Sequence, residues 1–386
     1  MDKIEFSIHP QVDNILRVDA LESSSESDER EHKLNFKLPA GVEPSSNLIA
    51  LALSTLCGKR YAEINMNLPV NEYCRRSIAD FTGAKVRADE SSSQVTTGTN
   101  ICLNFSGGFD SLACKMLLPE DTKLVSMDFG GNFSRERVFF EQFETNIVET
   151  NLLSTGLQRN SWSFMGIGSI LLQEHLGLSH FTFGNILEAA PANFLPSLRF
   201  RNPSFPPFAA AGMTAAPVAL GLTEIGTILV ASSFGPKHIA SSLQSLAGPN
   251  DSKMYRKYLL AKIVESKNGM NYGLPEVNPP QKPWFSFGKS FADDFLSCYI
   301  IKNLGAEAFE RAVSEIPVEI LRLAEECSLD FYERFNTNFY YKLPHHIRSH
   351  LYGRLETAGI QPYSERDWQE FTMVRSALSK FYPALA

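Results

Sequence analysis

The chain has 386 residues, of which 44% are hydrophobic and 20% are charged. This length is enough for two or three domains with a substantial core, and the composition is typical of a soluble globular protein. The formal net charge of −7 gives the protein no general attraction for nucleic acid, so a nucleic-acid partner is not expected.

The first 88 residues are predicted to form a small N-terminal α/β domain. No basic stretch followed by an apolar stretch opens the chain, so we expect no secretory signal and a cytoplasmic protein. Helices are predicted from Ser45 or Ser46 through residue 56, and from Asn71, which can cap a first turn, through residue 81, with the end of the second helix near Gly83. Short apolar runs typical of strands occupy residues 4–8, 15–20, 33–38, 61–66 and 85–88.

Two polar segments interrupt this part of the chain. Residues 22–31 are acidic and rich in serine, which fits either a phosphorylated or partner-binding loop or a solvated hairpin loop. Residues 89–99 are polar throughout and are predicted to be a linker, which makes them the clearest domain boundary in the sequence.

The segment N-I-C-L-N-F-S-G-G-F-D-S, residues 100–111, predicts a phosphate site. A short apolar strand over residues 101–105 leads through a turn with Gly107 and Gly108 into a helix that begins at Asp110 and Ser111. Such a turn presents backbone N–H groups and the positive end of a helix dipole to a phosphate or pyrophosphate. The glycines are needed because a side chain would block the approach of the anion to the backbone.

Polar side chains of the same turn could complete the site. The hydroxyls of Ser106 and Ser111 can donate to phosphate oxygens, and Asp110 could hold a metal ion, Mg²⁺, that bridges the phosphates. A tight strand-to-helix turn without a ligand is the alternative interpretation.

From residue 100 onward, strand and helix patterns alternate, which predicts a second domain over residues 100–283. We expect a Rossmann-like, doubly wound parallel sheet with helices on both faces and ligands at the carboxyl ends of its strands. Residues 139–148 are mixed in character. Strands are predicted at residues 101–105, 123–129, 180–183 and 227–232, and a helix at 162–175. Residues 284–386 are predicted to be a helical C-terminal region, with helices at 292–303, 306–314 and 318–333.

Charged residues and glycines follow the second of these strands. Asp128 ends it, at a position that commonly meets the adenosine part of a nucleotide, and two glycines allow close backbone approach. Arg135 and Arg137 could contact phosphate or a substrate carboxylate. They could equally lie on an exposed helix face and pair with Glu136 and Glu141.

The third predicted strand ends in a similar group of residues. Gly184 and Asn185 suit a backbone turn, and Glu188 is available to a metal or to substrate orientation. Arg199 and Arg201 suit an anionic substrate or the departing pyrophosphate. Solvated surface side chains are the alternative for all three charged residues.

The loop Ser-Gly-Gly-Phe-Asp-Ser at residues 106–111 resembles the pyrophosphate loop of the ATP pyrophosphatases, S-G-G-x-D-S, at all five specified positions. Residues 128–136 and 183–205 resemble more loosely the D-Y-G-x-x-x-x-x-E run and the G-x-N turn of the branch that contains 7-cyano-7-deazaguanine synthase. The resemblance covers roughly residues 100–235.

This resemblance implies a domain of the PP-loop (HUP) type that cleaves ATP between its α- and β-phosphates with Mg²⁺. The implied catalytic residues are Asp110, Ser111 and Arg135. The implied ATP- and pyrophosphate-binding residues are Ser106, Gly107, Gly108, Phe109, Asp110, Ser111, Asp128, Gly184 and Asn185. Lys257 or Lys262, in a basic helical segment, could reach the α-phosphate or could lie on a solvated face.

The cysteines depart from the pattern of that branch. The synthase binds structural zinc through a cysteine cluster near its C-terminus, which requires four thiolates at close pairwise spacing. Here Cys298 and Cys327 stand alone and no C-x-x-C occurs, so no zinc site is expected. Buried free thiols are expected instead of disulfides.

An apolar region at residues 205–234 is long enough to raise a membrane interpretation. Prolines and Glu224 interrupt it, so the better prediction is a buried helix followed by a strand, with no membrane contact.

These observations predict an ATP-dependent ligase or synthase that forms AMP. A substrate oxygen, most simply a carboxylate, would attack the α-phosphorus, and an amine, ammonia or sulfur nucleophile would then displace AMP. The substrate could be a small molecule or a protein or peptide, selected by the N-terminal domain or the helical C-terminal region. The sequence is compatible with an oligomer and does not specify the oligomeric state.

Two alternatives stay open. A tRNA-thiolating or tRNA-ligating enzyme needs a basic, aromatic-lined face. A non-catalytic scaffold that binds ATP or AMP would not need Asp110, so the intact loop favours the enzyme.

Overall fold

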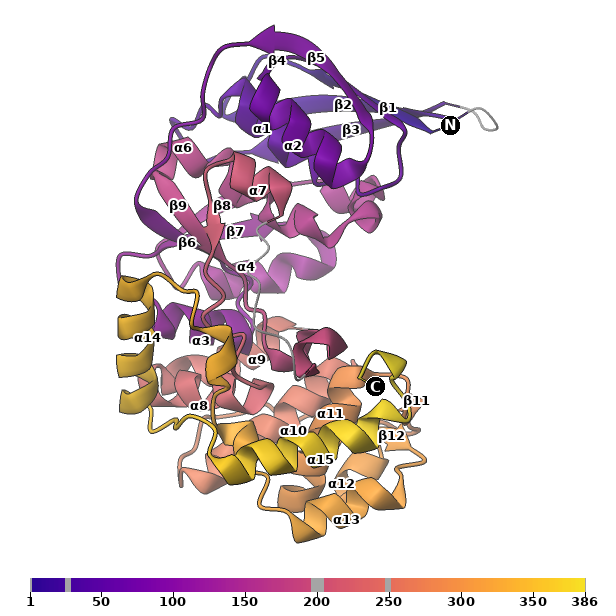
Figure 1. Cartoon of the computed structure of the whole chain (residues 1–386), viewed down its shortest axis with the longest axis vertical. Helices are drawn as coiled ribbons and strands as arrows, with labels where there is room; N and C mark the ends of the chain where they lie inside the picture. Colours follow the sequence, from indigo (N-terminus) through magenta and orange to yellow (C-terminus); the bar gives the residue numbers. More distant parts are fainter. Residues whose placement is uncertain (1, 25–28, 196–204, 247–250, 386) are drawn as a thin grey trace. The chain divides into compact units, whose positions relative to one another are not determined.

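The computed structural model describes residues 2–24, 29–195, 205–246 and 251–385 (Figure 1). The chain forms two compact units. Unit 1 contains Met1–Ser106, Asp121–Phe183 and Asn202–Ala216, and unit 2 contains Gly107–Glu120, Gly184–Arg201 and Pro217–Ala386. The predicted linker over residues 89–99 therefore lies inside unit 1, and no boundary between the units falls near residue 283. The chain passes from unit 1 to unit 2 directly after Ser106 and again directly after Phe183.

Unit 1 is organised around a ten-stranded sheet with the order β10-β9-β6-β7-β8-β3-β2-β1-β4-β5. Strands β10, β9, β6, β7 and β8 run parallel to one another, as do β1, β4 and β5. Strand β3 joins the two groups by antiparallel pairing with β8 and with β2. The strands are β1 (Lys3–Ile8), β2 (Ile15–Ser23), β3 (Arg30–Lys37), β4 (Glu63–Asn71), β5 (Lys85–Ser91), β6 (Asn100–Asn104), β7 (Lys123–Asp128), β8 (Thr145–Thr150), β9 (Leu178–Thr182) and β10 (Thr214–Ala215).

The predicted α/β fold with a mostly parallel sheet is confirmed. The N-terminal strands, which the sequence assigned to a small domain of their own, belong to the same sheet as the later strands. The connection is short, because β3 and β8 pair only at Phe36 with Thr150 and at Lys37 with Glu149.

The strand order reverses at β6. Strands β7 and β8 follow β6 on one side, whereas β9 and β10 lie on its other side. In parallel sheets such a reversal opens a crevice at the carboxyl ends of the two strands that flank it. β6 ends at Asn104, two residues before Ser106, and β9 ends at Thr182, two residues before Gly184. The two segments that carry most of the predicted site residues therefore begin at this point of the sheet.

The helices of unit 1 follow from local capping and packing signals. Asn71 caps α2 by accepting a hydrogen bond of 2.8 Å from the Cys74 N–H, and Gly83 ends that helix with φ +73°, as predicted. Figure 1 shows α1 and α2 next to each other, and α1 packs on β4. These helices and the buried faces of the strands enclose the apolar core of the unit. The helices are α1 (Ser46–Ser54), α2 (Glu72–Thr82), α4 (Ser134–Phe140), α5 (Ile167–Leu171), α6 (Gln173–Leu176) and α7 (Pro206–Ala210).

Two segments of unit 1 differ from the predicted elements. The helix predicted over residues 162–175 is divided into a 3-10 turn at Trp162–Gly166 and the short helices α5 and α6. Gly168 explains the tight packing of α5 on the sheet, since a β-carbon there would lie 2.9 Å from the Met127 sulfur. The mixed segment at residues 139–148 consists of the end of α4 and most of β8.

Unit 2 is mainly helical. Its helices are α3 (Phe109–Leu117), α8 (Glu224–Phe234), α9 (Ile239–Leu246), α10 (Ser252–Lys267), α11 (Phe291–Leu304), α12 (Ala306–Glu310), α13 (Val318–Glu326), α14 (His345–Thr357) and α15 (Glu365–Ser379). Strands β11 (Phe285–Ser286) and β12 (Val313–Ser314) form a separate parallel pair. The helices predicted at residues 306–314 and 318–333 are shorter, and end at Glu310 and Glu326.

The strand predicted over residues 227–232 is wrong, because these residues lie in the middle of α8. The β-branched residues suggested a strand, but Thr223 caps the helix by accepting a hydrogen bond from the Gly226 N–H. Burial of Ile228 and Val230 then outweighs the weak strand preference of the segment. Among the residues that the structure describes, no helix combines the length and apolar character needed to cross a membrane.

Candidate functional site

The glycine-rich loop enters unit 2 immediately after Ser106. Gly107 has φ +82°, a left-handed conformation that favours glycine, and Gly108 occupies the N-cap position of α3. The hydroxyls of Ser242 and Ser245 on α9 donate hydrogen bonds of 2.7 and 3.3 Å to the carbonyl oxygen of Gly107. These hydrogen bonds from α9 therefore stabilise the conformation of the loop.

Gly108, the N-cap residue of α3, has no side chain that could cap the helix. The first N–H groups of a helix lack partners within the helix, and the helix dipole adds a partial positive charge there. The Ser111 hydroxyl is buried and donates to the Gly108 carbonyl at 3.0 Å. Ser106 is exposed, whereas the Phe109 ring is fully buried.

Asp110 is engaged by two side chains of unit 2. The ammonium group of Lys257 on α10 lies 3.1 and 3.3 Å from the two carboxylate oxygens of Asp110, and the Thr227 hydroxyl lies 3.1 Å from one of them. Lys257 is completely buried and also packs over the Phe109 ring, 5.6 Å from its centroid. The sequence proposed Lys257 or Lys262 as alternatives. Lys262 is instead half-exposed and pairs with Glu265.

A buried network of ion pairs continues from Lys257. Glu224, the first residue of α8, binds Lys257 with one carboxylate oxygen and Arg256 with the other, at 2.9 Å in the second case. Arg256 also binds Asp293 of α11 at 2.8 Å. Four helices, α3, α8, α10 and α11, are thereby connected through charged side chains.

The environment of this network fixes the charge of its members. Burial alone would lower the pKa of Lys257, but Asp110 and Glu224 raise it above its ordinary value. Burial would likewise raise the pKa of Glu224, and the charges of Arg256 and Lys257 lower it instead. Both groups are therefore charged at neutral pH.

Glu188 lies next to this network, but its environment favours the neutral, protonated carboxyl group. It follows β9 in a 3-10 turn, Leu187–Ala189, and is 4% exposed. One carboxylate oxygen accepts the Glu224 N–H at 2.8 Å, and the other is buried without a hydrogen-bond partner. Burial, reinforced by the negative charge of Glu224, raises the pKa of Glu188 to about 8. The surface alternative that the sequence left open does not apply.

Gly184 brings the chain that follows β9 against the start of α3. A β-carbon at Gly184 would lie 2.8 Å from the Ser111 amide nitrogen and 3.0 Å from the carbonyl carbon of Asp110. Only glycine leaves this space free, as the sequence suggested for a backbone turn. Asn185 is exposed.

Asp128 belongs to unit 1 and has a different set of partners. It accepts the Gly130 N–H at 2.9 Å and binds Arg137 at 2.7 Å. Arg137 also pairs with Glu141 and Glu149, which agrees in part with the exposed-face alternative. Arg135 is exposed. Arg199 and Arg201 lie outside the described residues.

Charged side chains line two of the cavities among the described residues of unit 1. One, of about 510 Å³, lies at the carboxyl ends of β7 and β8, and its lining includes Asp128, Gly130 and Glu149 together with Arg17 and Lys37. The N-terminal strands β2 and β3 thus contribute cations to the end of the parallel strands.

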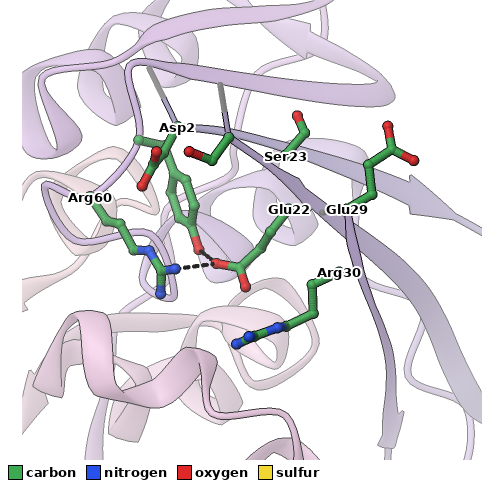
Figure 2. A pocket seen from close by; sticks show the side chains of 8 residues that line it. Asp2, Glu22, Ser23, Glu29, Arg30 and Arg60 are labelled. Carbon is green, nitrogen blue, oxygen red and sulfur yellow. Dashed lines mark hydrogen bonds and ion pairs between the residues drawn. The ribbon is translucent and has the colours of Figure 1, made fainter. Parts of the chain in front are cut away.

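The other cavity, of about 360 Å³, lies beside the acidic loop, whose residues 25–28 are outside the described part of the chain. Figure 2 shows the carboxylate of Glu22 in contact with Arg60. The hydroxyl of Tyr61 donates to the same carboxylate. His32 Nε2 donates to the second oxygen of Glu22 at 2.9 Å. Both carboxylate oxygens of Glu22 therefore have hydrogen-bond or ion-pair partners.

Asp110, predicted to hold Mg²⁺, has both carboxylate oxygens within hydrogen-bond distance of Lys257 and one also within reach of Thr227. These contacts do not use every lone pair of the carboxylate, so magnesium binding by Asp110 stays a prediction. Within the described ranges, no group of three or more His, Cys, Asp or Glu side chains is placed to hold a metal ion. The six cysteines are all buried and free, as predicted.

Sequence reasoning missed Glu224, Arg256 and Asp293. A usable signal was present for Glu224, because Thr223-Glu224 is a typical helix start with an acid in the first turn. No signal links Arg256 to Asp293, since their contact depends on the packing of α10 and α11. No family model matches the chain, and neither the curated proteins nor the solved structures include a match to it.

Proposed function

We propose that the loop at residues 107–111 binds the phosphates of ATP, and that the protein cleaves ATP to AMP and pyrophosphate. The observation that carries the proposal is the S-G-G-F-D-S loop, whose Gly107 carbonyl accepts hydrogen bonds from Ser242 and Ser245 and which leads through Gly108 into the nine-residue helix α3. We further propose that the parallel part of the sheet is a Rossmann-like fold of the PP-loop type. The reversal of strand order at β6 supports this assignment.

Backbone N–H groups at the start of α3 are the principal phosphate ligands in this proposal. The side chains of the buried network sum to a charge of −1, from Asp110, Glu224 and Asp293 against Lys257 and Arg256. The network therefore positions Asp110 and α3, and does not itself attract an anion.

Lys253 supplies the accessible cation. It lies one turn before Lys257 on α10, is exposed, and has no ion pair among the described residues. The charge of Lys257 and burial lower the pKa of Lys253, while the charge of Asp110 opposes that shift. Because Lys253 lies one turn from Lys257, which pairs with Asp110, we propose it as a contact to a phosphate oxygen.

The proposed reaction begins with attack of a substrate carboxylate oxygen on the α-phosphorus. The bond from that phosphorus to the bridging oxygen breaks, and its electron pair leaves with pyrophosphate. The loop N–H groups and Lys253 stabilise the charge that builds on the leaving group. An amine, ammonia or sulfur nucleophile then displaces AMP from the acyl-adenylate. Mg²⁺ would enter with the phosphates of ATP, and Asp128 and Arg135 remain predicted contacts.

Non-catalytic nucleotide binding is the second candidate. The observation in its favour is the ion pair between Asp110 and Lys257, which gives Asp110 a structural role. The presence of Asp110 therefore no longer distinguishes an enzyme from a passive binder.

The test uses the full chain with α-labelled ATP, Mg²⁺ and a panel of carboxylates with ammonia. Formation of AMP and pyrophosphate supports the enzyme, and formation of ADP and phosphate contradicts it. ATP binding without turnover, reduced by substitution of Lys253, supports the second candidate. Absence of ATP binding at millimolar concentration contradicts both.

A further inference from the structure

A cavity of about 500 Å³ lies in unit 2, separate from the loop at residues 107–111. Its volume falls in the range of small-molecule sites. Its walls come from three segments: residues 193–195, which follow the turn that carries Glu188, the 3-10 turn Thr337–Phe339 with the preceding Asn336, and α15. On α15 the lining residues are spaced along one face of the helix: Trp368, Phe371, Thr372 and Arg375.

The cation of this cavity is incompletely partnered. Arg375 donates from one terminal nitrogen to the Phe194 carbonyl at 3.4 Å, and its buried Nε has no hydrogen-bond partner. The described lining residues include no carboxylate. Nearby acids of α15 have other partners, since Asp367 binds Arg334 and Glu370 binds the Ser328 and Leu329 N–H groups. A guanidinium in this state is suited to a planar oxyanion, which it can meet with two N–H groups.

The remaining lining residues suit a flat molecule. Phe194 stacks on Phe371 with ring centroids 5.1 Å apart, and the half-buried ring of Trp368 lies edge-on to Phe371. Carboxamides of Asn193, Asn336 and Asn338 and two threonine hydroxyls provide neutral polar contacts at the wall. Aromatic faces with a few polar groups are typical of sites for ring-containing ligands.

The walls of the cavity are tied to the segment that precedes α8. The Asn336 N–H donates to the Gly221 carbonyl at 2.8 Å, and the Leu187 N–H donates to the Leu222 carbonyl at 2.8 Å. The Asn193 carboxamide also donates to the Leu187 carbonyl at 2.9 Å. The same short segment leads directly into Glu224.

We infer that this cavity binds a small organic anion, with a planar carboxylate on Arg375 and a flat, mostly apolar body against Trp368 and Phe371. The site goes beyond the proposed ATP chemistry, because nothing in the argument depends on the loop or on nucleotide binding.

The test is titration calorimetry on the full chain without ATP, with benzoate, nicotinate and 1-naphthoate, each beside its uncharged carboxamide. We expect at least one carboxylate to bind tenfold or more tightly than its amide. Arg375→Gln should remove that preference, whereas Arg366→Gln, an exposed arginine of the same helix, should preserve it. Equal binding of acid and amide, no binding of any acid at millimolar concentration, or a preference that survives Arg375→Gln would each overturn the inference.

A second variant keeps the test informative if Arg375→Gln unfolds. Thr372 is exposed at the cavity wall, so Thr372→Glu adds a negative charge and leaves Arg375 in place. We expect it to weaken carboxylate binding at least tenfold, and unchanged binding would count against the site. ATP binding should be the same in both variants as in the wild type, so failure here is distinguishable from failure of the proposed function.

Discussion

Two buried glutamates, Glu22 of unit 1 and Glu188 of unit 2, differ in charge. Glu22 in unit 1 is 8% exposed and Glu188 in unit 2 is 4% exposed. Burial would raise the pKa of Glu22, but hydrogen bonds from Tyr61 and His32 and the charge of Arg60 lower it. Glu188 has one backbone N–H and a negative neighbour, so its pKa rises to about 8. At Glu22, hydrogen-bond donors and a cation outweigh the effect of burial, whereas Glu188 lacks such partners and burial raises its pKa.

The same contrast applies to cations. Arg137 in unit 1 pairs with three carboxylates, but its side chain is 37% exposed. Lys257 in unit 2 pairs with two and is completely buried. Exposed pairs contribute little to stability, whereas loss of one partner from a buried pair leaves an uncompensated charge.

The largest effect is expected from Lys257→Met. This substitution leaves Asp110 and Glu224 without their shared cation, and should lower the free energy of unfolding by about 3–5 kcal/mol. Urea denaturation of the full chain measures the change. Arg137→Met is the matched control, with an expected loss of about 1 kcal/mol or less. Equal losses of unfolding free energy in the two variants would contradict the distinction between the buried ion pairs of Lys257 and the exposed ion pairs of Arg137.

The next effect is a pair of opposite pH dependences. Because the pKa of Glu188 is raised in the folded protein, its contribution to stability is complete below the unfolded pKa and is lost as the pH rises towards 8. Glu188→Gln lacks this titrating group. Its free energy of unfolding relative to that of the wild type should therefore rise by on the order of a few kcal/mol between pH 5 and pH 8.

Glu22 should behave in the reverse sense. Its lowered pKa means that its contribution is present above the unfolded pKa and is lost as the pH falls through the folded pKa. Glu22→Gln should therefore be most destabilising near neutral pH and less so at pH 3. Thermal melting as a function of pH checks both variants, and parallel curves would refute the assignment of opposite states.

A smaller effect is expected from Gly184→Ala. The new β-carbon would collide with the Ser111 amide, so the start of α3 must shift, at a cost of about 1–3 kcal/mol. ATP binding should weaken in the same variant. Gly353 in α14 has open space around its β-carbon position, so Gly353→Ala should raise stability by about 0.5–1 kcal/mol. Calorimetric unfolding measures the stability of the two variants. A Gly184→Ala variant as stable as the wild type would contradict the close approach of Gly184 to the Ser111 amide.

The smallest effect concerns binding alone. Lys253→Gln should weaken ATP binding by about tenfold, which corresponds to about 1.4 kcal/mol, and should leave stability nearly unchanged. Lys262→Gln, on the same helix but paired with Glu265, should bind ATP like the wild type. Isothermal titration with the two variants measures the difference, and equal affinities would exclude Lys253 from the phosphate site.

The sequence predicted the elements that carry local signals. Asn71 and Gly83 marked the ends of α2, and the apolar runs before Ser106 and Asp128 marked β6 and β7. The segment at 227–232 failed because burial on all sides hides the period that separates a helix from a strand. The network of Arg256, Glu224 and Asp293 could not be predicted, since its distances exist only after three helices have packed.

The pairing of β3 with β8 has a consequence for any shortened form of the protein. A chain that began at residue 100 would lose β1 to β5, and β8 would then become an outer strand with unpaired backbone groups along one side. Exposed strand edges of this kind recruit other chains and promote aggregation. The native outer strand β5 avoids this hazard with Lys85, Arg87 and Glu90 along its length. Pairing with β3 thus covers the end of β8, at Glu149 and Thr150.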